Sequence, residues 1–89
     1  MNVWELTILR IIESLGGTAG LQQVFRSLES GSFMALTEDH LRETKWQQRP
    51  AYQHQVRKHA SNLAKAGDLT NVSWGVYAIT DKGKQRISA

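Results

Sequence analysis

The sequence predicts a small α+β domain in which three helices form the core and an antiparallel β-hairpin projects from it. Apolar residues recur at helical spacing in two segments before residue 30 and along one side of residues 50–66. Two short β-prone segments, 69–72 and 76–79, flank Ser73-Trp74-Gly75. The order helix, short strand, helix, helix, hairpin and short final helix is typical of the winged helix-turn-helix fold.

Length and composition restrict the class of protein. A chain of 89 residues with 40% hydrophobic residues is expected to form a single globular domain over residues 1–89. The absence of cysteine excludes disulfides and thiolate metal sites and fits a cytoplasmic protein. The first apolar segment contains Glu5 and Arg10, so we expect neither a signal peptide nor a membrane span.

The charged residues divide unevenly along the chain. Residues 1–41 contain two Lys or Arg and five Asp or Glu, whereas residues 42–89 contain nine and three. A basic half suggests a surface that faces a polyanion. The alternative interpretation is a solvated charged face that aids solubility.

The first helix is predicted to run from Asn2 to Gly16-Gly17. Asn2 can cap it, with Glu5 three residues later in the capping-box position. Its apolar stripe comprises Trp4, Ile8, Leu9, Ile11, Ile12 and Leu15. Its other side carries Thr7, Arg10, Glu13 and Ser14, while Val3 and Leu6 fall outside the stripe. The two glycines tolerate the left-handed conformation that ends helices.

Residues 18–50 are predicted to hold a minimal strand, a second helix and an insertion. Thr18-Ala19-Gly20 suits the strand, and apolar residues at helical spacing predict the helix over about 20–29. The 31–48 insertion separates the second and third main helices and includes a short helix from about 38 to 44. Pro50 favours the first turn of the third helix and disfavours helical geometry at Arg49.

The third helix is predicted to have a narrow core side and a long basic face. The core side comprises Tyr52, Val56, His59, Ala60, Leu63 and Gly67. After the hairpin, Thr80 can cap a last helix over about 81–87, with Lys82, Lys84 and Arg86 directed into solvent.

The exposed face of the third helix and the hairpin are the candidate DNA-binding site. A helix can enter the major groove, where Gln suits adenine edges and Arg suits guanine edges. The residues expected in the groove are Gln53, His54, Arg57, Lys58 and Ser61. Lys45, Arg49 and Lys65 suit the flanking phosphates, and Ser73 and Trp74 lie on the wing. A polar helix face is equally common in any soluble protein.

Two tryptophans have two interpretations each. Trp74, at the hairpin tip, either contacts nucleic acid or a partner, or packs back on the helix below. Trp46, in the basic KWQQR segment, has the same alternatives, with core burial favoured.

No metal, cofactor or catalytic site is expected. His54 and His59 lie on different sides of the third helix, and no cysteine or carboxylate completes a ligand set. The chain lacks a glycine-rich phosphate loop and a nucleophile elbow, so we expect neither an enzyme nor a small-molecule substrate.

The segment RPAYQHQVRKHASNLAKAGDLTNVSWGVYAITDKG resembles the end of the winged-helix domain at the N-terminus of Mrr-type restriction endonucleases. The similar features are a Leu-x-Lys-x-Gly helix end, the hairpin Trp-Gly-x-Tyr-x-Ile-Thr and a closing Asp-Lys-Gly; an apolar first helix, Gly-Gly and LQQVFRSLE also fit. The family usually has a basic residue at the position of Trp74. The resemblance implies recognition of DNA, sometimes with modified bases, on behalf of a nuclease.

The expected function is therefore binding of double-stranded DNA, with the third helix in the major groove and the wing along the backbone or minor groove. The alternative is a protein-interaction module that docks onto a nuclease or a second copy of the chain. That docking would use Val3, Leu6 and the 31–48 insertion. Winged helices serve both purposes.

Overall fold

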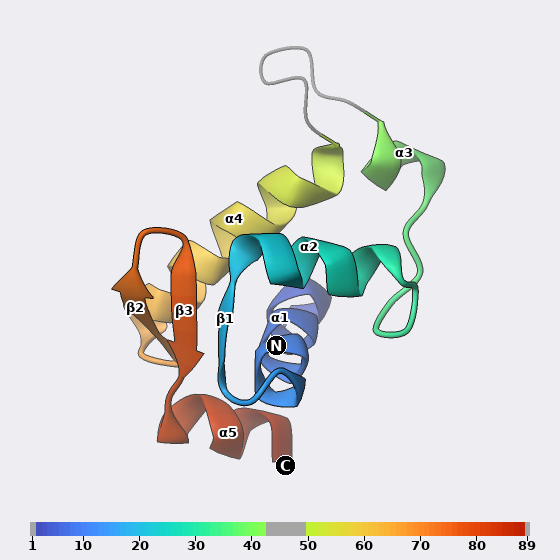
Figure 1. Ribbon diagram of the computed structural model, residues 1–89. Coiled ribbons are helices and arrows are strands. Elements are labelled where there is room, and N and C mark those ends of the chain that lie inside the picture. Colours follow the sequence, from blue (N-terminus) through green and yellow to red (C-terminus); the bar gives the residue numbers. More distant parts are fainter. Residues whose placement is uncertain (1, 43–49, 89) are drawn as a thin grey trace.

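The computed structural model describes residues 2–42 and 50–88. These residues form five helices and three strands (Figure 1). The helices are α1 (Val3–Ser14), α2 (Leu21–Glu29), α3 (Glu38–Leu41), α4 (Ala51–Ala66) and α5 (Asp81–Ser88). The strands are β1 (Thr18–Gly20), β2 (Leu69–Ser73) and β3 (Val76–Ile79). The predicted order is confirmed, although α3 ends at Leu41 within the part of the insertion that is described.

The three strands form one antiparallel sheet in the order β1-β3-β2. Strand β1 is as short as predicted and pairs Thr18 with Ala78 and Gly20 with Val76. In the β2–β3 hairpin, Asn71 lies opposite Tyr77 and Ser73 lies opposite Val76. The register therefore shifts between these pairs and leaves Val72 as the extra residue of a β-bulge.

The core lies where α1, α2 and α4 pack together and against the sheet (Figure 1). Its α4 side consists of Tyr52, Val56, Ala60 and Leu63, all with at most 1% of their surface exposed. Together with the sheet order, this three-helix packing is a winged helix-turn-helix arrangement. The predicted core side of α4 is confirmed apart from Gly67, which is exposed because the helix has already ended there.

Asn2 caps helix α1 as predicted, whereas the Glu5 carboxylate contacts His59 and no capping box is formed. Leu15 and Thr7 also differ from the predicted pattern of burial. The Trp4 amide donates to the Asn2 side chain at 2.7 Å, so Asn2 caps the helix. Leu15 is 40% exposed because it follows the last helical residue and leaves the apolar stripe. Thr7 is only 5% exposed, because α1 contacts α2, α4, α5 and β3 and so buries more than one side.

A side-chain contact between Glu5 and His59 inside the domain joins α1 to α4. The Glu5 carboxylate lies 3.0 Å from Nδ1 of His59, which is 8% exposed. The pair joins the edge of the apolar stripe on α1 to the core side of α4. The expectation that His59 is a satisfied boundary imidazole is confirmed.

Helix α5 closes the base of the hairpin, and its three basic residues are exposed as predicted, although two of them also bond to groups of the domain. The Thr80 hydroxyl accepts from the Gly83 amide at 3.1 Å, which confirms Thr80 at the helix start. Arg86 turns inward and donates to the fully buried Asp68 at 2.6 Å. Lys82 donates to the carbonyl of Ala66 at 2.6 Å. Lys82 meets a carbonyl of the last turn of α4, where carbonyls lack a partner within the helix. Arg86 meets the carboxylate of Asp68, two residues after that helix ends.

Candidate nucleic-acid interface

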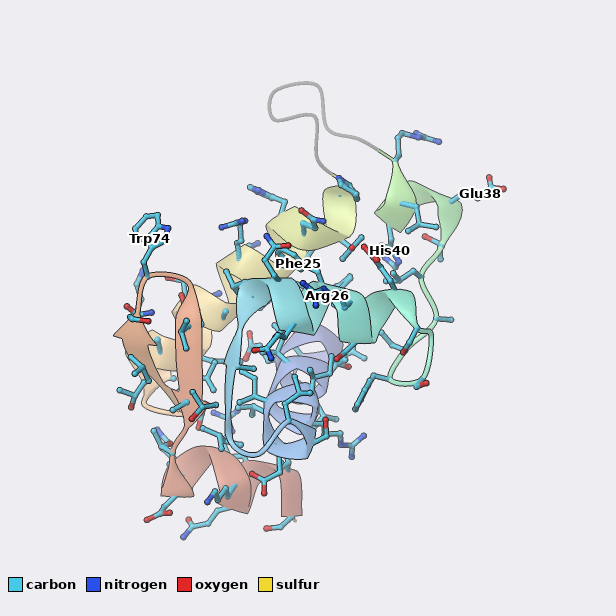
Figure 2. All side chains as sticks on the ribbon, in the orientation of Figure 1. Phe25, Arg26, Glu38, His40 and Trp74 are labelled. Atoms are coloured by element: carbon cyan, nitrogen blue, oxygen red, sulfur yellow. The ribbon has the colours of Figure 1, made fainter. Side chains whose placement is uncertain are left out.

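The hairpin ends in a two-residue turn, Trp74-Gly75, that lifts one aromatic ring clear of the protein. Gly75 has φ +69°, a left-handed conformation that suits glycine at a tight hairpin turn. The Trp74 side chain is 99% exposed and projects from the tip of the wing (Figure 2). Packing of Trp74 on the helix below is therefore excluded, and the ring is available for contact with another molecule.

The wing is held in place from both sides. The Leu21 amide at the start of α2 donates to the Gly75 carbonyl at 2.8 Å. The Asn71 side-chain amide donates to the carbonyls of Ser73 at 2.9 Å and Val76 at 3.1 Å. These bonds span the bulge and the turn, so the position of Trp74 is set by α2 and the sheet as well as by the hairpin.

Arg57, halfway along α4, is positioned by a stack of aromatic rings. Its guanidinium carbon lies 5.7 Å from the centroid of the Phe25 ring, a cation–π distance. The Phe25 ring in turn meets Tyr52 edge-on, with 5.9 Å between centroids and an angle of 85°. Nε of Arg57 is buried and has no hydrogen-bond partner among the described residues. The guanidinium is thus oriented by packing and retains unused donors.

The start of α4 is tied to the end of α2 through Tyr52. The Tyr52 hydroxyl donates to the Glu29 carboxylate. Burial raises the pKa of the Tyr52 hydroxyl, and the Glu29 carboxylate raises it further, whereas the hydrogen bond from Gln53 lowers it. That bond, from the Gln53 amide to the Tyr52 oxygen, is long at 3.4 Å. Gln53 therefore lies in the first turn of α4 with part of its amide engaged.

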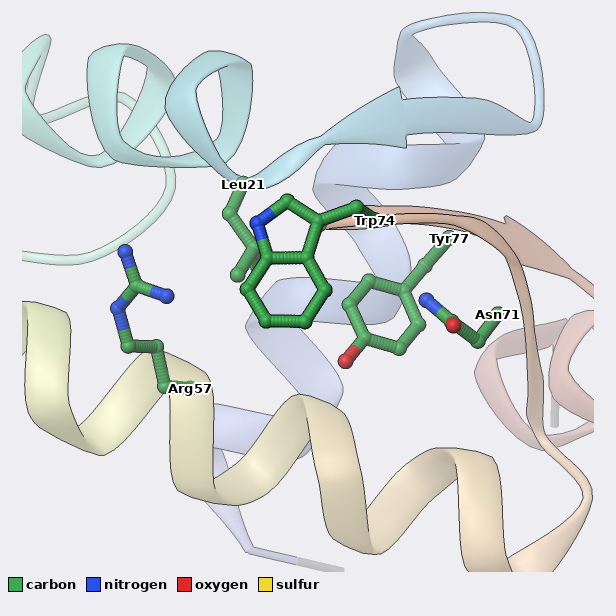
Figure 3. Close-up of a pocket in the computed structure, with 6 residues that line it drawn as sticks. Leu21, Arg57, Asn71, Trp74 and Tyr77 are labelled. Carbon is green, nitrogen blue, oxygen red and sulfur yellow. The ribbon is translucent and has the colours of Figure 1, made fainter.

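Arg57 and Trp74 line a shared cleft. Two overlapping hollows of about 180 Å³ and about 270 Å³ lie between the wing, the first turn of α2 and the middle of α4. Both are smaller than the roughly 300–1,000 Å³ typical of pockets for drug-sized ligands. Figure 3 shows Arg57 on one side of Trp74, with Tyr77 and Asn71 on the other side and Leu21 behind. The cleft brings together two predicted site residues that lie 17 positions apart in the sequence.

The remaining predicted residues lie along α4 and beyond it. His54, Lys58 and Lys65 are exposed, and Ser61 is half-buried. Ser73 is exposed beside Trp74 on the wing. The predicted phosphate contacts Lys45 and Arg49, together with Trp46, lie outside the described residues.

Sequence reasoning predicted only Arg57 and Trp74 of the cleft and missed its other lining residues, among them Leu21, Asn71 and Tyr77. Tyr77 carried a usable signal, since it lies on the strand that follows the wing turn. Asn71 carried none, because a hairpin without a bulge would place Val72 opposite Tyr77. Because of the bulge, the Asn71 side-chain amide and not Val72 lies opposite Tyr77.

The described residues also limit the class of site. Among the described residues there is no group of three or more His, Cys, Asp or Glu placed to hold a metal ion. His40 instead caps α3, accepting from the Thr37 amide at 3.0 Å, and meets the Trp4 ring edge-on at 5.2 Å. None of the helices in residues 2–42 and 50–88 has the length and apolar character needed to cross a membrane.

Comparison with known proteins identifies one family. Residues 3–89 match the Mrr N-terminal domain. Searches of curated proteins and of solved structures gave no significant match. The match covers nearly the whole chain, including α4, the wing and the cleft between them. The chain therefore belongs to the Mrr N-terminal domain family, which links it to restriction systems.

Proposed function

We propose that this domain binds double-stranded DNA for a restriction or defence nuclease, with α4 in the major groove and the wing along the backbone or minor groove. The observation that carries the proposal is the shared cleft of Arg57 and Trp74. It places the basic face of α4 and the tip of the wing on one surface. A duplex that meets α4 would then also meet the wing.

The side chains of this surface suit the two kinds of contact that DNA requires. Arg57 is held on Phe25 with unused donors, which favours contact with a base edge or a phosphate. The exposed His54 and Lys58 extend the surface along α4, and Lys65 lies near its end. Lysine and arginine that neutralise phosphates release counterions, so binding is expected to depend strongly on salt.

We further propose that this chain does no catalysis and that a separate nuclease domain cuts the DNA. Support comes from the cleft, where the lining residues that the structure describes include no carboxylate, cysteine or histidine. The domain would then select the DNA site, and its nuclease would cleave the DNA.

A salt titration tests DNA binding. Affinity for a duplex should fall steeply between about 50 and 200 mM salt. The double variant Arg57→Ala/Lys58→Ala should flatten the log–log slope by about one to two units. Lys84→Ala is the matched control, because Lys84 is exposed on α5, at the end of the molecule opposite the wing tip (Figure 1). Absence of duplex binding at low salt would refute the proposal.

Protein interaction is a second candidate function, supported by apolar exposure in the insertion. Leu41 is 51% exposed and Phe33 is 38% exposed, and Val3 on α1 is 55% exposed. Light scattering with and without a duplex separates the two candidates. A stable dimer whose mass does not change with DNA would favour interaction, whereas a monomer that gains mass with DNA would favour DNA binding.

A further inference from the structure

We propose that the cleft between the wing tip and α4 accepts one unpaired nucleobase, which stacks on the indole of Trp74 beside the guanidinium of Arg57. This inference rests on the proposed DNA-binding function and names the feature of the DNA that the site selects. The cleft combines an aromatic platform, a size suited to one ring system and polar groups for the edge of a base.

The platform is an exposed and well-positioned indole. Trp74 has 99% of its side-chain surface exposed, although a ring of this size is normally buried in part. The bonds from Leu21 to Gly75 and from Asn71 across the bulge fix the turn that carries it. An ordered turn favours stacking, because the backbone that carries the ring is already in place and only the side-chain rotamer remains to be fixed on binding. Every nucleobase has a π face that can stack on such a ring.

The size of the cleft favours one base rather than a base pair. Its hollows of about 180 Å³ and about 270 Å³ are too small for most drug-sized ligands. A single planar ring needs less space than those ligands do. In an intact duplex both faces of each base are covered by neighbouring bases, so only an unstacked base can offer its face to Trp74.

The polar groups of the cleft match the edge and the charge of a nucleotide. Arg57 lines the cleft, and its guanidinium group supplies N–H donors there. The Asn71 nitrogen donates to two wing carbonyls, which leaves its oxygen as an acceptor at the cleft. The Tyr77 hydroxyl adds a group that can donate or accept. Among the described residues no carboxylate lines either hollow, so none of them repels a phosphate there.

The test compares DNA ligands that differ at one nucleotide. Fluorescence anisotropy at one low salt concentration would give the affinity for a fully paired duplex, the same duplex with a one-base bulge, the duplex with an abasic bulge, and the bulged strand alone. The wild-type domain should bind the one-base bulge about tenfold more tightly than the paired duplex. With 2-aminopurine as the bulged base, stacking on Trp74 should also change its fluorescence.

Variants of the wing assign the preference to the cleft. Trp74→Ala should abolish the preference for the bulged base, and Trp74→Phe should retain part of it, because phenylalanine still stacks. Val72→Ala is the matched control, since Val72 is 57% exposed on the same wing and lines neither hollow. Circular dichroism would show that each variant keeps the fold.

The outcomes separate this inference from the proposed function. Equal affinity of the wild type for paired and bulged duplexes would overturn the inference and leave duplex binding intact. Equal affinity for base-containing and abasic bulges would also overturn it, because the domain would then be selecting a kink. Tight binding of the single strand alone, lost in Trp74→Ala, would support the cleft and refute the duplex proposal. Absence of binding to all four ligands would refute both.

Discussion

Removal of the Arg86 side chain should destabilise the domain severely, because it leaves a buried carboxylate without its cation. Asp68 is fully buried, and its Oδ2 lies 2.6 Å from Nη1 of Arg86. Its Oδ1 is buried without a hydrogen-bond partner among the described residues. The pair therefore joins a residue just after the end of α4 to helix α5, with the carboxylate shielded from water and the guanidinium in part exposed.

The magnitude follows from the burial of the two partners. Removing one partner of a fully buried pair costs about 3–5 kcal/mol. The Arg86 side chain is 35% exposed, so solvent reaches part of the site and a cost below that range, about 2–3 kcal/mol, is expected. A domain of this size has a free energy of unfolding of about 4–13 kcal/mol. Arg86→Ala should lower Tm by roughly 10–20 °C.

Urea denaturation of three proteins tests this reasoning: the wild type, Arg86→Ala and the double variant Asp68→Asn/Arg86→Ala. The double variant should be more stable than Arg86→Ala alone, because the neutral amide removes the orphaned charge. A loss below about 0.5 kcal/mol in Arg86→Ala would refute the prediction and would mean that the pair behaves like a surface salt bridge. Equal stability of the two variants would refute the assigned cause.

Three further predictions concern the base of the wing and the stack behind Arg57. Gly83→Ala should destabilise the domain by about 1–3 kcal/mol in urea denaturation, because a Cβ there would collide with the carbonyl oxygen of Asp68. Phe25→Leu should weaken duplex binding severalfold in an anisotropy titration, since the Arg57 guanidinium loses the ring that orients it. Burial raises the folded-state pKa of Tyr52 above the usual 10.0. The stability that the protonated hydroxyl contributes is therefore fully present below pH 10.0 and is lost as the pH rises through the folded-state pKa. Tyr52→Phe should remove this loss of stability at alkaline pH.

Each of these has a control and an outcome that contradicts it. Gly31→Ala serves as the control for Gly83, because a Cβ at Gly31 meets open space and only its φ of +77° opposes the change. Equal losses of unfolding free energy in the two variants would show that contact with Asp68 is not the cause.

For Phe25, an unchanged affinity for the duplex in a folded Phe25→Leu variant would mean that the ring does not orient Arg57. For Tyr52, the Tm of the wild type and of Tyr52→Phe would be measured from pH 8 to about 11. The same change of Tm with pH in both proteins would contradict the assigned pKa shift.

The sequence by itself determined the elements and most of their faces. Caps and breakers act within a few residues, so Asn2, Pro50 and Gly67 marked helix ends that the structure confirms. Helical periodicity selected the buried side of α4, and the strand pattern around Gly75 gave the hairpin. The same local signals placed Arg57 on α4 and Trp74 at the tip of the wing, which are the two principal residues of the candidate site.

Only the tertiary structure decided which distant residues meet. Glu5 and His59 lie 54 positions apart, and nothing in either neighbourhood marks the other as its partner. The sequence places Arg86 on the solvent side of a short helix, and only the fold brings its guanidinium against buried Asp68. The bulge at Val72 moved Asn71 opposite Tyr77, and the Leu21–Gly75 bond brought α2 to the wing. Local sequence controls backbone conformation over a few residues, whereas a cleft depends on how separate elements pack.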